Sequence, residues 1–190
     1  MIIGVAGYSG AGKSTFSKSL AEIIRGEVVD GDAVWMSTFY ENHEVCCKIM
    51  GEGFFGKPHG TVDTEYLCRR AYKKLRRIVH PLVNARFEEK VAEITGRGSI
   101  AIIDWCFLPE IDIVNACDVK ILIEAATAVR HNRLAARKNI HGAKMKIARK
   151  RDRGLRPVLQ KYEPTITIQN SEDTDIGIVS RNVAKILHST

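Results

Sequence analysis

The stretch GVAGYSGAGKST, Gly4 to Thr15, decides the fold of this 190-residue chain. Its Gly7, Gly12, Lys13 and Ser14 satisfy the pattern G-x-x-x-x-G-K-[ST]. The apolar segment IIGVA precedes the loop and the helical segment TFSKSLAEII follows it, which is the strand–loop–helix context that the pattern needs. We therefore predict a P-loop, a glycine-rich loop that binds phosphate groups, rather than a glycine-rich turn without a ligand.

Each residue type in this loop has a physical role. Glycines reach backbone dihedral angles that a Cβ atom would forbid, so successive N–H groups can point inward at phosphate oxygens. The following helix adds its positive N-terminal end. We expect Lys13 to contact the β- and γ-phosphates and Ser14 to place its hydroxyl on Mg²⁺. The predicted nucleotide-binding residues of the loop are Gly7, Ser9, Gly10, Ala11, Gly12, Lys13, Ser14 and Thr15.

The length of the chain is typical of one domain with its own core. Its net charge is +7, and the positive charge is concentrated between Arg130 and Arg156. This segment contains eleven Lys or Arg residues and one acid, Asp152. This segment has no aromatic residue besides two histidines, whereas a nucleic-acid surface usually combines basic and aromatic side chains. We expect a phosphate clamp and no nucleic-acid partner, with a solvated basic helix as the alternative.

The cysteines and the hydropathy pattern indicate in which cellular compartment we expect the protein. Cys46, Cys47, Cys68, Cys106 and Cys117 form no C-x-x-C pair, and we expect them to be reduced thiols of a cytoplasmic protein. The three residues before the loop segment, MII, are too short for a signal peptide. No apolar run approaches the roughly 20 residues of a membrane span, so we expect no membrane partner.

Apolar strands alternate with helical segments along the chain. We predict a helix to about Arg25 and a short strand in GEVVDGDAV that runs into a loop. A long helical stretch, residues 64–95, is interrupted at Pro81, where a proline can start or kink a helix. Strands are predicted in SIAIIDW, DVKILIEA and TITIQN, before a last helix, DIGIVSRNVAKIL. This order predicts an α/β fold with a parallel sheet flanked by helices and with ligands at the carboxyl ends of the strands.

Three aspartates follow predicted strands. Asp30 and Asp32 follow the second strand, and Asp104 follows the third. An acid at the end of a buried strand commonly supports the metal of a P-loop enzyme, and an acid near the P-loop can accept the proton of an acceptor hydroxyl. The alternative for each is a helix cap or turn residue: Asp30 and Asp32 can exchange these roles, and Asp104 can simply begin a loop.

The motifs resemble those of dephospho-coenzyme A kinases over nearly the whole chain. The matching segments are GVAGYSGAGKST, VVDGDAV, FFGKPHGTVDTEYL, RRIVHPLV, IIDWCFLPE, DVKILIEAATAVRHNRLAARKN and TITIQNSED, in the same order and spacing. The resemblance implies an ATP-dependent kinase that phosphorylates the ribose 3′-hydroxyl of dephospho-CoA, the last step of coenzyme A biosynthesis, with ATP and Mg²⁺. It also implies a three-layer P-loop kinase fold in one domain, residues 1–190, with a helical substrate-binding region at about 36–98 and a basic lid at about 139–156.

The same resemblance implies roles for individual residues. Asp32 matches the family's catalytic base, and Asn170 resembles the residue near the nucleotide base. Arg133 and Arg137 match the arginines close to the lid; four residues apart on a helix, they share one face and can grip the same triphosphate. His80 and Pro81 match the family's His-Pro pair in the substrate region, with a structural histidine as the alternative for His80. Together with the residues of the P-loop and the strand ends, the predicted catalytic residues are Asp32, Lys13 and Arg137, the substrate-binding residues Asp32, His80 and Asp104, and the metal-binding residues Ser14 and Asp104.

The sequence also departs from the family pattern. The family's Gly-Ile-Gly-Ser-Gly is Tyr8 to Gly12 here, which is closer to uridine-kinase-like loops, and the segment Trp105 to Glu110 has its proline shifted. Thr64 stands where the family often has arginine. The last two departures lie on the acceptor side, so a kinase acting on a nucleoside or another small molecule is the alternative. A nucleotide switch is a third possibility, but the chain lacks an N-K-x-D motif.

Overall fold

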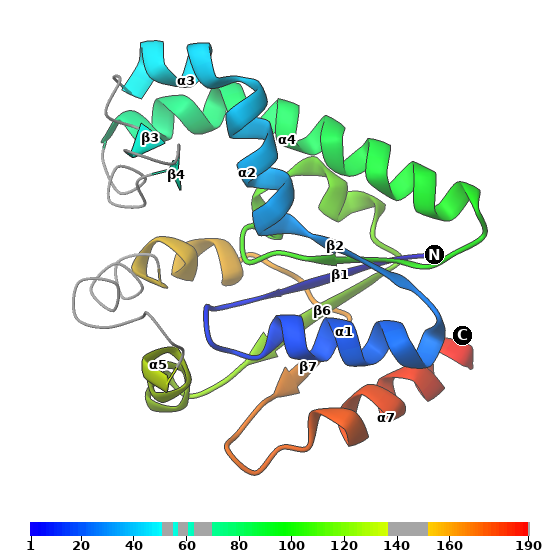
Figure 1. The fold of residues 1–190 in the computed structure, drawn as a ribbon. Helices are drawn as coiled ribbons and strands as arrows, with labels where there is room; N and C mark the ends of the chain where they lie inside the picture. The colour runs from blue at the N-terminus through cyan, green and yellow to red at the C-terminus, as the bar shows by residue number, and fades with distance from the viewer. Residues whose placement is uncertain (51–54, 57–60, 63–69, 137–151, 190) are drawn as a thin grey trace.

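A central parallel sheet organises the protein. The computed structural model describes residues 1–50, 55–56, 61–62, 70–136 and 152–189. Five strands form the sheet in the order β2-β5-β1-β6-β7 (Figure 1), namely β1 (Ile2–Gly7), β2 (Glu27–Asp30), β5 (Ala101–Asp104), β6 (Val119–Glu124) and β7 (Ile166–Gln169). All four pairings within it are parallel. The predicted α/β architecture is confirmed.

Helices cover both faces of this sheet. One face carries α1 (Lys13–Ile24) and α7 (Ile176–His188), and the other carries α2 (Gly31–Glu41) and α4 (Arg70–Gly96) (Figure 1). The remaining described elements are α3 (His43–Met50), α5 (Thr127–Ala136), a helix at residues 152–159, two short 3₁₀ segments, η3 (Leu108–Glu110) and η4 (Asp112–Ala116), and the small hairpin of β3 (Phe55–Gly56) and β4 (Thr61–Val62). None of the helices in the described residues is long and apolar enough to cross a membrane.

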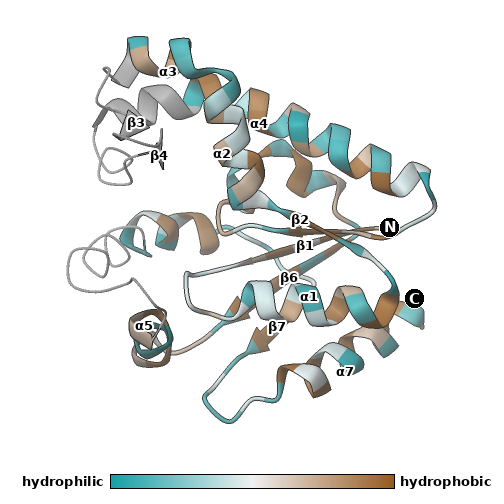
Figure 2. Ribbon diagram, viewed as in Figure 1, coloured by the Kyte–Doolittle hydropathy of each residue, from teal (hydrophilic) through white to brown (hydrophobic). Residues whose placement is uncertain are grey.

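Two hydrophobic clusters fill the space between the sheet and its helices. Successive side chains of a strand point to opposite faces, and β5 shows this directly, because Ile102 belongs to the cluster with Phe16 of α1 while Ile103 belongs to the cluster with Phe87 of α4. The central strands β1 and β5 are therefore apolar and buried on both faces, and Figure 2 shows brown residues along the sheet. On these two strands, polar side chains can gather only at the strand ends.

Two local predictions differ from the structure. The second strand does not run into a loop: it ends at Asp30, and α2 begins at once at Gly31. Asp30 causes this, because its carboxylate accepts a hydrogen bond from the N–H of Ala33 at 3.1 Å and caps the helix. The long helix α4 continues through Pro81. Proline leaves one carbonyl without its helical donor, yet the buried side chains of Val79 and Val83 on either side hold the helix on the core.

The predicted substrate region and lid are only partly described. In the region at about 36–98, the described backbone is mostly helical, in α2, α3 and α4. Of the predicted lid at about 139–156, residues 152–156 belong to the helix at residues 152–159, and residues 139–151 lie outside the described residues.

Candidate active site

The glycine-rich loop joins the end of β1 to the start of α1 in a conformation that requires glycine. Gly10 has φ = 79° and Gly12 has φ = 100°, a region that residues with a Cβ atom rarely adopt. A Cβ atom at Gly10 would lie 2.7 Å from the carbonyl oxygen of Arg130, and one at Gly12 would collide with the amide of Asn170. The loop is therefore packed against its supports, with the N-terminus of α1 at its end.

The side chain of Lys13, the first residue of α1, folds back over this loop. Its Nζ donates a hydrogen bond to the carbonyl oxygen of Tyr8 at 3.2 Å, and the N–H of Ala11 donates to the same oxygen at 3.2 Å. Ser14 and Thr15 follow in the first turn of α1 and are exposed. The P-loop thus has the lysine folded over the loop and two exposed residues with hydroxyl groups at the helix start.

Asp104 brings a buried carboxylate to this loop. It ends β5, next to Val5 of β1, and is only 8% exposed. Burial raises the pKa of its carboxyl, while a hydrogen bond from Ser14 and the charge of Lys13 act in the opposite direction. Its Oδ1 is buried and has no hydrogen-bond partner among the described residues. Ser14 and Asp104, the two residues predicted to bind the metal, are therefore neighbours.

This arrangement suits Mg²⁺ better than a metal held entirely by protein. In the described part of the chain no three His, Cys, Asp or Glu side chains gather into a metal site. Mg²⁺ usually takes one or two protein oxygens together with phosphate oxygens and water. The hydroxyl of Ser14 and the free oxygen of Asp104 are donors of that kind, so the residues present fit this ion.

Asp30 and Asp32 have different positions although they are two residues apart. Asp30 pairs in register with Asp104 and caps α2. It therefore has the helix-cap role that the sequence leaves open as an alternative. Asp32 lies in the first turn of α2, is exposed, and makes no hydrogen bond or ion pair with the described residues. Of the two, Asp32 has the carboxylate that remains available to an acceptor.

His80 belongs to an aromatic wall beside these aspartates. Its ring meets Trp35 of α2 edge-on, with centroids 5.3 Å apart. Trp35 in turn packs against Trp105, the residue after Asp104, at 5.5 Å. The wall continues from Trp105 to Phe87 of α4 at 5.6 Å. His80 is therefore linked to the carboxyl end of β5 through the rings of Trp35 and Trp105.

Asn170, which follows β7, and Arg133 of α5 support the P-loop. Asn170 follows β7 and is 2% exposed; its amide donates to the carbonyl oxygen of Ala11 at 2.7 Å. Arg133 of α5 donates to the side-chain oxygen of Asn170 at 3.2 Å and to the carbonyl oxygen of Ser171 at 2.7 Å. Both predicted nucleotide-binding residues are thus at the loop. Arg137 lies outside the described residues.

Sequence reasoning missed Arg130. This residue of α5 is 4% exposed, and its guanidinium donates to the carbonyl oxygen of Ser9 at 3.3 Å and to Asp152 at 2.5 Å. It also lies over the ring of Tyr8, 4.6 Å from the centroid. In the sequence Arg130 is one charge in a basic run, and only its helical spacing of three residues from Arg133 could have drawn attention to it.

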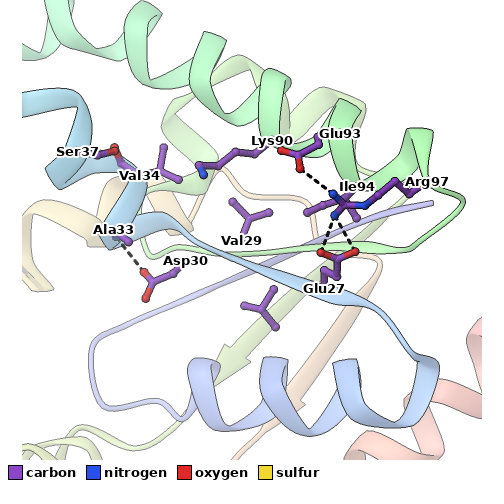
Figure 3. A pocket seen from close by; sticks show the side chains of 11 residues that line it. Glu27, Val29, Asp30, Ala33, Val34, Ser37, Lys90, Glu93, Ile94 and Arg97 are labelled. Carbon is purple, nitrogen blue, oxygen red and sulfur yellow. Dashed lines mark hydrogen bonds and ion pairs between the residues drawn. The ribbon is translucent and has the colours of Figure 1, made fainter. Parts of the chain in front are cut away.

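A separate hollow opens at the edge of the sheet and is not part of this site. It measures about 400 Å³ between β2, α2 and α4 (Figure 3). Arg97 occupies one end and forms ion pairs with Glu27 at 2.8 Å and Glu93 at 2.7 Å. Of the three strand-end aspartates, only Asp30 is among the described residues that line this hollow. Figure 3 shows the Asp30 carboxylate turned toward Ala33. The ion pair between Arg97 and Glu27 connects the end of α4 to the edge strand β2, so we interpret these charges as structural.

Comparison with known proteins identifies the family. The family model for dephospho-CoA kinase matches residues 1–156. The chain belongs to the dephospho-CoA kinase family. It is therefore a kinase, and the resemblance seen in its motifs is confirmed. A dephospho-CoA kinase of Corynebacterium jeikeium is 30% identical over 165 residues, which cover 81% of this chain and 84% of the relative. One of Borreliella burgdorferi is 25% identical over 141 residues, 71% of this chain and 67% of the relative.

Solved structures confirm the fold of this family member. A Thermus thermophilus protein aligns with a TM-score of 0.76 and 22% identity, covering 100% of this chain and 97% of its own. Dephospho-CoA kinase of Campylobacter jejuni aligns with a TM-score of 0.64 and 17% identity, covering 99% and 97%. Shikimate kinase of Acinetobacter baumannii gives 0.56 and 13%, covering 99% and 93%. At these identities the likeness concerns the P-loop kinase fold alone.

Proposed function

We propose that this protein transfers the γ-phosphoryl group of ATP to the ribose 3′-hydroxyl of dephospho-CoA. The observation that carries the proposal is the meeting of the P-loop with a buried acid at the carboxyl ends of the strands, in a chain of this family. Phosphoryl transfer needs positioning and charge stabilisation rather than covalent chemistry from the protein. The loop N–H groups, Lys13 and the Ser14–Asp104 pair supply both.

The donor half of the reaction uses the P-loop. Lys13 exchanges its hydrogen bond to the Tyr8 carbonyl for the β- and γ-phosphates, and its charge stays with the phosphoryl group as it leaves. Ser14 and Asp104 would hold Mg²⁺, which would neutralise phosphate charge. We propose that Arg137 also contacts the ATP triphosphate. Arg133 and Asn170 support the loop that binds it.

The acceptor half uses Asp32, the aspartate without a hydrogen bond or ion pair to the described residues. Asp32 is exposed at the start of α2, next to the strand ends, and its carboxylate can accept the proton of a sugar hydroxyl. Asp104 lies behind it, and the aromatic wall of Trp35 and His80 bounds the same side. We therefore assign the small-molecule acceptor to the side of the strand ends that faces α2.

An ATP-consumption assay with a panel of acceptors tests this function. Dephospho-CoA should support turnover with Mg²⁺, and coenzyme A, whose 3′-position already carries a phosphate, should not. Uridine, other nucleosides and nucleoside monophosphates should be poor acceptors. Turnover with a nucleoside and none with dephospho-CoA would replace the acceptor in this proposal but not the phosphoryl transfer. ATP consumption that no acceptor changes would contradict the proposal itself.

A further inference from the structure

Arg130 joins three parts of the molecule that are distant in sequence. Its guanidinium contacts the P-loop at Ser9, the start of its own helix at Ala125 and Thr127, and the helix at residues 152–159 at Asp152. The Arg130–Asp152 ion pair is buried, with side chains 5% and 14% exposed. Because a buried ion pair is weak evidence for stability, this cluster suggests a role in positioning.

The contact with Ser9 fixes the direction of one peptide group. In a trans peptide the C=O and the next N–H point in opposite directions. Because Arg130 holds the C=O of Ser9 toward α5, the N–H of Gly10 must point to the other side of the loop. Asn170 acts in the same way on the C=O of Ala11, which directs the N–H of Gly12. Inward N–H groups at such alternate positions are what a phosphate-binding loop needs.

We propose that Arg130 is a positioning residue for ATP, which keeps the N–H of Gly10 directed at the phosphates, and that Asp152 holds Arg130 in place. The inference rests on the proposed function, since a loop that bound no nucleotide would need no such orientation. It also connects the P-loop mechanically to the helix at residues 152–159. Arg130 acts through the loop backbone and does not itself touch the reacting atoms.

The other arginines nearby show why direct phosphate binding is a poorer explanation for Arg130. Arg130 donates to four acceptors, the carbonyl oxygens of Ser9 and Ala125, the Thr127 hydroxyl and the Asp152 carboxylate. Arg153 and Arg156 line the same cavity of about 460 Å³ and are exposed, without hydrogen bonds or ion pairs among the described residues. They are the arginines free to meet an anion there, so the control for charge alone comes from outside this cavity: Arg181, which is exposed on α7.

The test measures the Kd of a non-hydrolysable ATP analogue with Mg²⁺ by calorimetry, well below the melting temperature of each variant. Arg130→Gln should weaken binding about 10-fold or more, because a hydrogen bond to a charged group is lost. Arg181→Gln removes the same charge from α7 and should change Kd by less than about threefold. Asp152→Asn should weaken binding, and the double variant should be no weaker than Arg130→Gln, because Asp152 acts through Arg130.

Several results would overturn the inference. Unchanged affinity in Arg130→Gln would do so, as would an equal loss in Arg181→Gln, which would mean that net charge matters and orientation does not. Additive losses in the double variant would show two independent roles. If Arg130→Gln does not fold, Arg130→Lys replaces it: it keeps a charge for Asp152, cannot also reach Ser9, and should still lose affinity. A wild-type protein that binds no analogue would refute the proposed function and this inference together.

Discussion

Replacing Asp104 with asparagine should stabilise the protein without nucleotide and weaken its binding of Mg²⁺ and ATP. The Asp104 carboxyl is 8% exposed, and its pKa is raised by burial and, to a lesser extent, by the charges of Asp30 and Asp32. Asparagine keeps the shape and an oxygen for the Ser14 hydroxyl while it removes the buried charge. Relief of such functional strain typically adds about 0.5–2 kcal/mol to the free energy of unfolding, and Tm rises by about 2–4 °C per kcal/mol.

The stabilisation should depend on pH with a defined sign. An acid whose pKa is raised in the folded state opposes folding when it is ionised, so the penalty is complete above its folded pKa. The penalty disappears as the pH falls below the value of the unfolded chain, 3.8. Asp104→Asn should therefore exceed the wild type in stability near neutral pH, and the difference should vanish near pH 4.

Nucleotide should reverse the order of the two proteins. A ligand at 100 times its Kd stabilises the folded state by about 2.7 kcal/mol, whereas after a 100-fold loss of affinity the same concentration gives only about 0.4 kcal/mol. Thermal unfolding of both proteins with and without Mg²⁺ and ATP measures this. Asp30→Asn is the matched control, because asparagine caps a helix as well as aspartate does. A destabilised Asp104→Asn variant, or equal stabilisation of both proteins by nucleotide, would refute the reasoning.

Three further substitutions test the loop and the base. Lys13→Ala should lower kcat by roughly 10²-fold or more while the fold persists, and near-normal turnover would contradict P-loop phosphoryl transfer. Asp32→Asn should lower kcat by roughly 10²–10⁴-fold with little change in ATP affinity, and Asp30→Asn should cost little; similar effects of the two would remove Asp32 as the base. Gly12→Ala should destabilise the protein more than Gly98→Ala in chemical denaturation, because both glycines have positive φ but a Cβ atom has open space only at Gly98; equal losses would mean that the dihedral angle alone matters.

The parts of the fold that could be predicted are those that short segments encode. The P-loop is contiguous in sequence, and its glycines, Lys13 and Ser14 are recognisable without tertiary information. The buried strands are apolar on both faces, which gives continuous hydrophobic runs. The start of α2 is also encoded locally, because Asp30 precedes an apolar segment at the spacing of a helix cap, which is one of the two structural roles that the sequence leaves open for it.

The supports of the loop could not be predicted because their partners are far apart in the chain. Asn170 reaches Ala11 across 159 positions, and Arg130 reaches Ser9 across 121. The family resemblance placed Asn170 near the nucleotide, but nothing in the sequence distinguishes a buried arginine from its exposed neighbours in a basic run. The pairing of Ser14 with Asp104 was predictable only because strand ends in a parallel sheet meet at one edge.

Identification of the phosphorylated product tests the central claim most directly. After incubation of the protein with dephospho-CoA, ATP and Mg²⁺, phosphorus and proton NMR should show one new phosphate monoester, on the 3′-oxygen of the adenosine ribose, formed in equal amount to ADP. The Lys13→Ala variant in parallel should form almost none. An unmodified dephospho-CoA in the presence of released ADP, or a phosphate on any other oxygen, would contradict the account.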